Sequence, residues 1–224
     1  MTHSRVSTVD WEDDIYAQGQ QLNHWPFSDL VSAVYGIAAG RDPKTLRVLE
    51  VGAGAGNNVV FLAEAGFQTT AQDMSPSAIE YARQRLNAKG LTADLHVGDL
   101  VSLPFEDEAF DIVIDRGAFT QNSLENTTKA AAEAHRVLTP GGTLLCFDLM
   151  SAGHADKRFG TEVSHHAYDH FTDGVFQRVG LTLFVDEDDI EEIFAPFHTV
   201  DAVTVSKHRG ETPLWEAYTI TATK

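Results

Sequence analysis

From residue 46 onward, short runs of apolar and β-branched residues alternate with segments whose apolar residues recur every three or four positions. The first pattern is typical of buried strands and the second of amphipathic helices. Strands are expected at 46–51, 67–73, 92–97, 110–115 and 143–150, and helices at 57–66, 76–90 and 125–138. This alternation predicts βαβ units around a mostly parallel sheet, in an α/β sandwich of three layers.

Three segments of the chain depart from this pattern. Acidic residues crowd the first turn of a helix expected over 186–197, and two alternating runs at 198–206 and 215–223 predict an antiparallel hairpin. Residues 150–184 contain four histidines and are too long for an ordinary connection, so we expect an insertion over the active site. Residues 1–45 carry no βαβ signal. We expect them to form an N-terminal helical cap on a single domain of residues 46–224.

A glycine turn and three acids mark the ends of predicted strands. The turn is Gly52-Ala53-Gly54-Ala55-Gly56, and Asp73, Asp99 and Asp115 end the next three strands. Ligands of parallel sheets bind at the edge where the carboxyl ends of the strands meet. Backbone N–H groups at a helix start bind polar groups, and a carboxylate there accepts from a ribose diol or an adenine amine. Each feature alone also fits a structural turn, but together they predict a nucleoside-type ligand.

These segments carry a resemblance to a known family. In order, VLEVGAGAGNN, Asp73, GDL, FDIVIDRGAF and RVLTPGGTLL resemble the motifs of class I S-adenosylmethionine-dependent methyltransferases over residues 46–148. The resemblance implies a Rossmann-like fold with a seven-stranded, mostly parallel sheet whose last strand is antiparallel. It also implies S-adenosyl-L-methionine as the cofactor.

The same resemblance implies where each part of the cofactor binds. Glu50 and the backbone of residues 52–54 would face its methionine part, Asp73 its ribose hydroxyls, and Met74 would pack on adenine. The implied binding residues are completed by Gly52, Ala53, Gly54, Asn57, Gly98, Asp99, Leu100 and Asp115, of which Asp99 and Leu100 would lie at the adenine edge. From the N-terminal segment, Tyr16 is the preferred contact.

The net charge of the chain and the absence of two family motifs restrict the class of molecule that can accept the methyl group. The chain has 16 Lys and Arg against 33 Asp and Glu, a formal charge of −17 that would repel a nucleic acid. The segment DRGAFTQN after the fourth strand lacks the N/D-P-P-Y/F signature of enzymes that methylate amino groups of bases or glutamine, and no cysteine pair is present. We therefore expect methyl transfer to an oxygen or nitrogen of a small molecule, with no nucleic-acid or membrane partner. The oligomeric state is left open.

Little catalytic machinery is needed, because a sulfonium is already an activated methyl donor. An acceptor held in line must still lose its proton, and His165 and His166 are the candidate general bases. No metal is expected, since adjacent histidines in an irregular segment lack a defined ligand spacing. Cys146 lies in an apolar run and is expected to be a buried, inert thiol.

Two other functions use the same turn. An NAD(P)-dependent oxidoreductase would also bind through Asp73, although the early third glycine and Asn57 depart from the dinucleotide pattern. A non-catalytic cofactor-binding module would act through the N-terminal segment. The N-terminus lacks the apolar core of a signal peptide and no run reaches the length of a membrane span, so a cytoplasmic location is expected.

Overall fold

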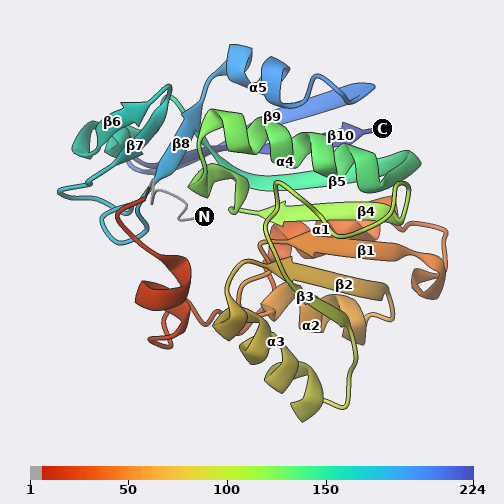
Figure 1. The fold of residues 1–224 in the computed structure, drawn as a ribbon. Helices are drawn as coiled ribbons and strands as arrows, with labels where there is room; N and C mark the ends of the chain where they lie inside the picture. Colours follow the sequence, from red (N-terminus) through yellow and green to blue (C-terminus); the bar gives the residue numbers. More distant parts are fainter. Residues whose placement is uncertain (1–6) are drawn as a thin grey trace.

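The computed structural model describes residues 7–224, and its centre is a parallel sheet (Figure 1). Its five parallel strands run in the spatial order β3, β2, β1, β4, β5. In chain order they are β1 (Arg47–Val51), β2 (Gln68–Asp73), β3 (Asp94–Val97), β4 (Phe110–Arg116) and β5 (Leu138–Ser151). Each of the five predicted strands is therefore present.

Two long strands extend the sheet beyond β5. β10 (Thr212–Thr223) pairs antiparallel with β5, and β9 (Thr199–Arg209) pairs antiparallel with β10. The predicted hairpin and the predicted antiparallel last strand are confirmed. Together these seven strands give the mostly parallel sheet that the sequence predicts.

Helices cover both faces of the sheet, which makes the three layers. Apolar residues of α1 and α2 pack with β1, β4 and β5 on one face, where α3 also packs, and those of α4 and α5 cover the other face. The helices are α1 (Ser28–Ile37), α2 (Asn57–Glu64), α3 (Pro76–Ala88), α4 (Leu124–Val137) and α5 (Glu187–Ile193). The helix α3 begins as its sequence predicts, with Ser75 accepting from the Ala78 amide and proline in the first turn.

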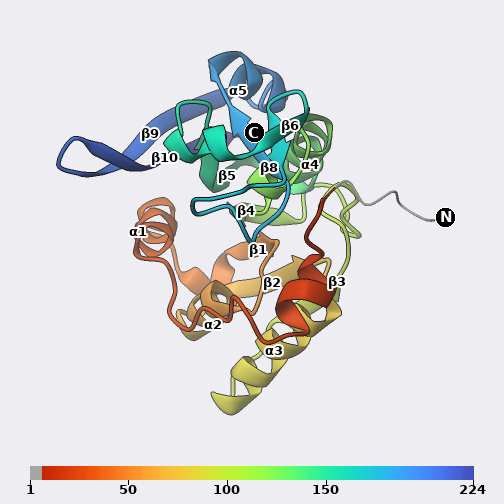
Figure 2. The same ribbon diagram turned by 90° about the vertical axis from the view of Figure 1, so that its left-hand side faces the viewer.

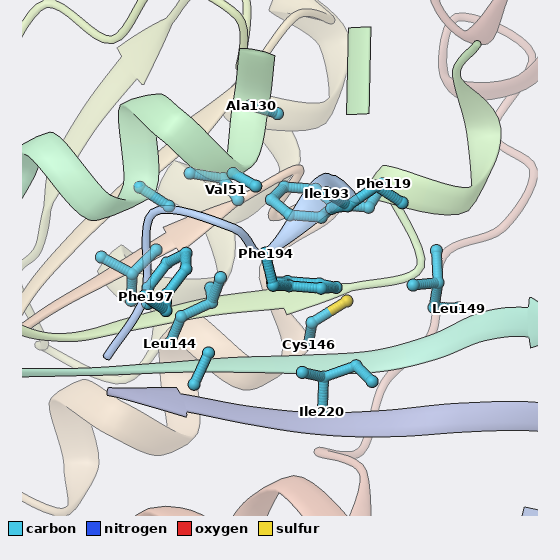
Figure 3. Close-up of a cluster of buried hydrophobic side chains, with 14 of the residues drawn as sticks. Val51, Phe119, Ala130, Leu144, Cys146, Leu149, Ile193, Phe194, Phe197 and Ile220 are labelled. Carbon is cyan, nitrogen blue, oxygen red and sulfur yellow. The ribbon is translucent and has the colours of Figure 1, made fainter. Parts of the chain in front are cut away.

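The face under α4 and α5 contains the largest apolar cluster. Figure 3 shows Cys146 of β5 there, beside Phe194 and Ile220. The Cys146 side chain is fully buried, and burial raises the pKa of its thiol well above the usual value. The expectation of a buried thiol is confirmed.

Residues 150–184 add strands that the sequence analysis did not predict. β6 (Thr161–Ser164) and β7 (Ala167–Asp169) form a short antiparallel pair, and β8 (Thr182–Val185) joins β7 to the end of β5. The sheet therefore has ten strands rather than seven. These three strands have three or four residues each, too few to show an alternating pattern.

The described part of the N-terminal segment contains three helical elements, η1 (Trp11–Tyr16), α1 and η2 (Pro43–Thr45), and the first of them lies against the glycine turn and α3. A single π-helical turn, η1 (Trp11–Tyr16), packs through Ile15 and Tyr16 on Ala55 and Ala78. Figure 2 shows η1 beside the start of α3. Among residues 7–224, no helix is long and apolar enough to cross a membrane.

Arg136 of α4 fixes the connection between β3 and β4. Its guanidinium donates to the carbonyls of Leu103 and Phe105, at 3.0 and 2.7 Å, and to the carboxylates of Asp107 and Glu133. We expect Arg136→Met to lower the free energy of unfolding by about 2–3 kcal/mol. The reason is that the two carbonyls and the two carboxylates lose their shared charged donor at the same time.

Lys129→Met is the matched control, since the partner of Lys129 among residues 7–224 is the exposed Glu125 one turn away. It should cost less than about 0.5 kcal/mol in urea unfolding. Equal losses in the two variants would contradict the structural role of Arg136.

Candidate active site

A crevice of about 270 Å³ opens at the carboxyl ends of β1, β4 and β5. Its walls come from separate parts of the chain: the glycine turn at residues 52–55, the N-terminal segment, the loop after β4, the ends of β5 and β10, and residues 175–179 of the insertion. The predicted turn therefore lies in the same crevice as the two segments that were expected to cover it.

A second hollow, of about 430 Å³, lies at the opposite edge of the sheet. Its walls include Arg47, Gln68, Asp94 and Phe110, the first residues of four parallel strands. Ligands of parallel sheets bind outside the carboxyl ends of the strands. The crevice at the glycine turn is therefore the candidate site.

Only glycine fits two positions of the turn. Gly52 and Gly54 have φ angles of +62° and +52°, a region that side chains disfavour. A Cβ on Gly52 would lie 2.2 Å from the Cβ of Ala118, and one on Gly54 would lie 2.6 Å from the hydroxyl of Tyr16. A side chain is therefore excluded at these two positions, and the turn presents bare backbone to the crevice there.

Asp73 ties the turn to the end of β2. One carboxylate oxygen accepts from the Gly54 amide and the other from the Ser75 amide, each at 2.8 Å. Burial raises the pKa of Asp73, while the two amides act in the opposite direction. The carboxylate lies at the predicted strand end, and each oxygen retains a lone pair for a ligand hydroxyl.

Glu50 is a buried carboxylate with one free oxygen. Its Oε1 accepts from the side-chain amide of Asn58 at 2.7 Å, whereas Oε2 has no partner among the described residues. Burial raises the pKa of Glu50 to about 8, and the nearby charges of Asp115 and Asp73 add to this effect. Because Glu50 lines the crevice, the free oxygen fits a cationic donor such as the ammonium of a bound amino acid.

Tyr16 and Asn57 both line the crevice, as predicted for contacts with the ligand. The Tyr16 ring is buried against the turn, and burial raises the pKa of its hydroxyl. Asn57 donates through its amide to the backbone carbonyl of Trp25 at 2.9 Å. This bond joins the start of α2 to the N-terminal segment.

The residues implied for adenine lie outside the crevice, at the ends of β2 and β3. The Met74 side chain is 66% exposed, and Asp99 is exposed with one oxygen accepting from the Val101 amide at 3.1 Å. Leu100 packs at the edge of the main apolar cluster. An adenine ring here would therefore lie on an open surface between β2 and β3.

Gln72 of β2 is a residue of this region that sequence reasoning missed. The side-chain amide of Gln72 is buried and has no partner among the described residues, and a Cβ on Gly98 would lie 3.0 Å from its nitrogen. A glutamine inside a predicted buried strand is the signal that could have found it.

Asp115, which was predicted to complete the pocket, is not part of the crevice lining in this structure. Its carboxylate is fully buried, with one oxygen accepting from the amides of Ala118 and Phe119 and the other 3.2 Å from the sulfur of Cys146. Burial raises its pKa to about 7. Asp115 instead shapes the loop after β4, and that loop lines the crevice.

His165 and His166 are not placed to act as general bases on this crevice. Both rings approach the carboxylate of Asp189, at 3.1 Å from His165 and 2.6 Å from His166, and neither residue lines the crevice. Asp189 also caps α5 together with Asp186. A base must reach the proton that it removes, and in this structure neither histidine borders the crevice. The β6–β7 turn directs them toward the start of α5 instead.

The crevice contains a charged pair that the sequence analysis did not select. Arg116 and Asp148 form an ion pair in its wall, and the guanidinium carbon of Arg116 lies 3.9 Å from the centre of the Phe27 ring. Asp148 has a φ of +53°, a strained conformation for a residue with a side chain. Its position near the end of the predicted fifth strand, at the same edge as the other acids, could have revealed it.

Aromatic side chains form much of the remaining wall. They come from the N-terminal segment, the insertion and β10, and none belongs to a motif. These lining residues are Trp11, Phe27, Phe176 and Trp215.

Comparisons with known proteins agree with this geometry. Residues 48–142 match the model of a methyltransferase domain family. The chain is 36% identical over 104 residues to a demethylmenaquinone methyltransferase of Deinococcus radiodurans, which covers 46% of this chain and 42% of the relative. It is 30% identical over 154 residues to a ubiquinone/menaquinone biosynthesis C-methyltransferase of Rhodopseudomonas palustris, covering 66% of this chain and 58% of the relative.

The fold has a close structural counterpart. A SAM-dependent methyltransferase of Methanosarcina mazei superposes with a TM-score of 0.68 at 17% identity, covering 89% of this chain and 98% of that one. The predicted resemblance to methyltransferases is confirmed for the domain at residues 48–142, and the likeness to the Methanosarcina mazei structure confirms the Rossmann-like fold. The chain spans about half the length of the first curated relatives it matches.

The glycine turn generates the first prediction for the site. Gly54→Ala should weaken cofactor binding at least about tenfold, because the added carbon strains a positive φ and meets the Tyr16 hydroxyl. Gly54→Ala combined with Tyr16→Phe should recover part of the loss, since the 2.6 Å contact disappears. Gly36→Ala is the control, because nothing lies within 4 Å of the added carbon. An unchanged dissociation constant in a folded Gly54→Ala variant would refute the assigned cradle.

Glu50 generates a prediction on pH. Because its pKa is raised to about 8, the side chain is mostly protonated at pH 7 before the cofactor binds. An ammonium beside Oε2 favours the carboxylate, so binding at pH 7 should release close to one proton per cofactor. Calorimetry in buffers of different ionisation enthalpy measures this number. Glu50→Gln should abolish the release, and equal release by both proteins would contradict the assignment.

Proposed function

We propose that this protein is an S-adenosylmethionine-dependent methyltransferase whose acceptor is a small molecule with a ring. The observation that carries the proposal is that one crevice joins two kinds of wall. Its lining contains both the glycine turn with the free Glu50 oxygen and several aromatic residues. A ligand on the turn and a ring on the aromatic wall would therefore meet in one space.

The residues at the turn fit the cofactor. S-adenosylmethionine supplies an activated methyl group on a sulfonium. On our proposal, Glu50 binds its ammonium, the backbone of residues 52–54 faces its methionine part, and Asp73 accepts from the ribose hydroxyls. Met74, Asp99 and Leu100 would bind adenine at the open end between β2 and β3.

The aromatic lining indicates the chemical class of the acceptor. Phe27 and Trp215 are half-buried, and Phe176, which is 4% exposed, stacks with Trp215 at a centroid distance of 6.3 Å. Aromatic side chains favour offset or edge-to-face contact with a ring. The names of the relatives from Deinococcus and Rhodopseudomonas refer to quinone substrates, which also contain a ring. The sequence favours an oxygen or nitrogen acceptor, and the name C-methyltransferase of the Rhodopseudomonas relative adds a ring carbon to the acceptor atoms to be tested. Methylation of a ring hydroxyl and methylation of the neighbouring ring carbon would use the same aromatic residues. The two reactions differ in which acceptor atom lies in line with the methyl group.

Asp148 is the group that we propose to take the proton of an acceptor hydroxyl. The acceptor's electron pair forms the new bond to the methyl carbon, the bond to sulfur breaks, and the proton passes to a carboxylate. Asp148 lines the crevice, and its ion pair with Arg116 holds the carboxylate in place. The strained backbone at Asp148 supports a functional role, because such strain clusters at active sites.

The proposal is tested with methyl-labelled S-adenosylmethionine and a panel of small hydroquinones, catechols and aromatic amines. We expect label in a ring compound, with mass spectrometry locating the methylated atom. Binding of S-adenosylhomocysteine without transfer to any acceptor would favour the non-catalytic module. Transfer only to acceptors without a ring would contradict the proposed acceptor class.

We expect Asp148→Asn to lower kcat about 100-fold with a hydroxylated acceptor, a typical effect of losing a general base. The deficit should shrink as the pH rises past the pKa of the acceptor hydroxyl. Asp29→Asn is the matched control, because Asp29 also lies within 4.0 Å of Arg116 but does not line the crevice. Equal effects of the two substitutions, or a pH-independent deficit, would exclude Asp148 as the base.

A further inference from the structure

β9 has an unpaired edge. Within residues 7–224 its only partner strand is β10, and all eleven of its residues are exposed. Figure 2 shows the tip of the β9–β10 hairpin projecting away from the rest of the molecule. Long exposed edges present unpaired N–H and C=O groups, and proteins usually protect them with proline or a covering element. β9 contains no proline.

One face of this strand has a self-complementary order of side chains. Asp201, Val203, Val205 and Lys207 alternate along β9 and therefore lie on the same face. Val203 is 52% exposed and Val205 38% exposed. The order on this face is acid, apolar, apolar, base. When a second copy of the strand runs in the opposite direction, each apolar residue therefore meets an apolar residue and each charge meets an opposite charge.

We propose that two copies of this chain pair through β9, antiparallel and centred on Thr204. In this register Val203 lies opposite Val205 of the partner subunit, and Asp201 lies opposite Lys207 of the partner subunit. A two-fold axis repeats each pair, so the contact contains two apolar pairs and two ion pairs. The two sheets then form one continuous sheet across the axis, as an isologous interface requires.

Neighbouring registers fit less well. Centring on Val205 places Val203 opposite a lysine, and centring on Val203 places Val205 opposite an aspartate. A shift of one residue in one strand places unlike faces together and is incompatible with the two-fold axis. Only the Thr204 register pairs apolar with apolar and acid with base, and cross-strand pairs of these kinds stabilise sheets.

Charge also favours this edge as the place for a second copy. Two chains with a formal charge of −17 repel each other over most of their surfaces. β9 instead ends in Lys207, His208 and Arg209, with Asp201 as its only acid. The edge is therefore one place where a second copy meets no excess of negative charge.

The proposed contact lies next to the crevice. Lys207 is opposite Trp215 in the β9–β10 register, and its ammonium lies 5.8 Å from the centre of the Trp215 ring. Trp215 lines the crevice. The contact itself does not depend on the proposed function, since it rests on the strand edge alone.

Sedimentation velocity of the full chain tests the pairing through charge reversal. Asp201→Lys and Lys207→Asp each place like charges opposite each other, and each should weaken dimerisation at least about tenfold. The double variant restores opposite charges and should restore the dimer. Glu191→Lys is the control for net charge, because this exposed residue lies on α5. A monomeric wild type, or a dimer that all variants leave unchanged, would overturn the proposal.

A cysteine placed on the axis tests the register. Thr204→Cys should form a disulfide-linked dimer on mild oxidation, because residue 204 lies opposite itself at a distance that a disulfide spans. Ser206→Cys should not, since the two copies of that residue would lie about 13 Å apart along the strands. Cys146 is buried and does not compete. Equal crosslinking of both variants, in proteins whose circular dichroism matches the wild type, would contradict the register.

Discussion

The hydrogen bond from the Gly54 amide to the Asp73 carboxylate holds the candidate site together. It joins the glycine turn after β1 to the end of β2, and the second oxygen of the same carboxylate holds the Ser75 amide at the start of α3. Glu12 of the N-terminal segment accepts from the hydroxyls of Ser75 and Ser77. The turn, two strand ends, α3 and the N-terminal segment are therefore fixed by one buried carboxylate and its immediate neighbours.

Buried acids also set the electrostatics of this region. The pKa of Glu50 is raised to about 8 and that of Asp115 to about 7, mainly by burial. An acid whose pKa is higher in the folded than in the unfolded chain stabilises the fold below its usual pKa near 4, and loses this contribution as the pH rises through the raised value. Without ligand, stability should therefore fall between about pH 5 and pH 8. A cation beside Glu50 offsets this loss, which links folding to occupancy of the crevice.

Features of the site that depend on residues close together in the sequence could be predicted. The turn at residues 52–56 and Asp73 could be placed because glycine and an acid at a strand end have few structural alternatives. The position of the Asp115 carboxylate could not be predicted, because sequence gives the end of a strand but not the direction of a side chain, which here points into backbone amides. The contact of His165 and His166 with Asp189 could not be predicted either, because Asp189 is 24 and 23 residues away along the chain. Phe176 and Trp215 belong to no motif, and only the tertiary fold brings them to the crevice.

Calorimetric titration of the wild-type protein with S-adenosylhomocysteine and with NAD tests the central claim most directly. S-adenosylhomocysteine retains the amino acid, ribose and adenine that the turn, Asp73 and the adjoining strand ends are proposed to bind. We predict saturable binding of S-adenosylhomocysteine with one site per chain and no detectable binding of NAD. Binding of NAD in preference to S-adenosylhomocysteine, or of neither compound by the folded protein, would contradict the account.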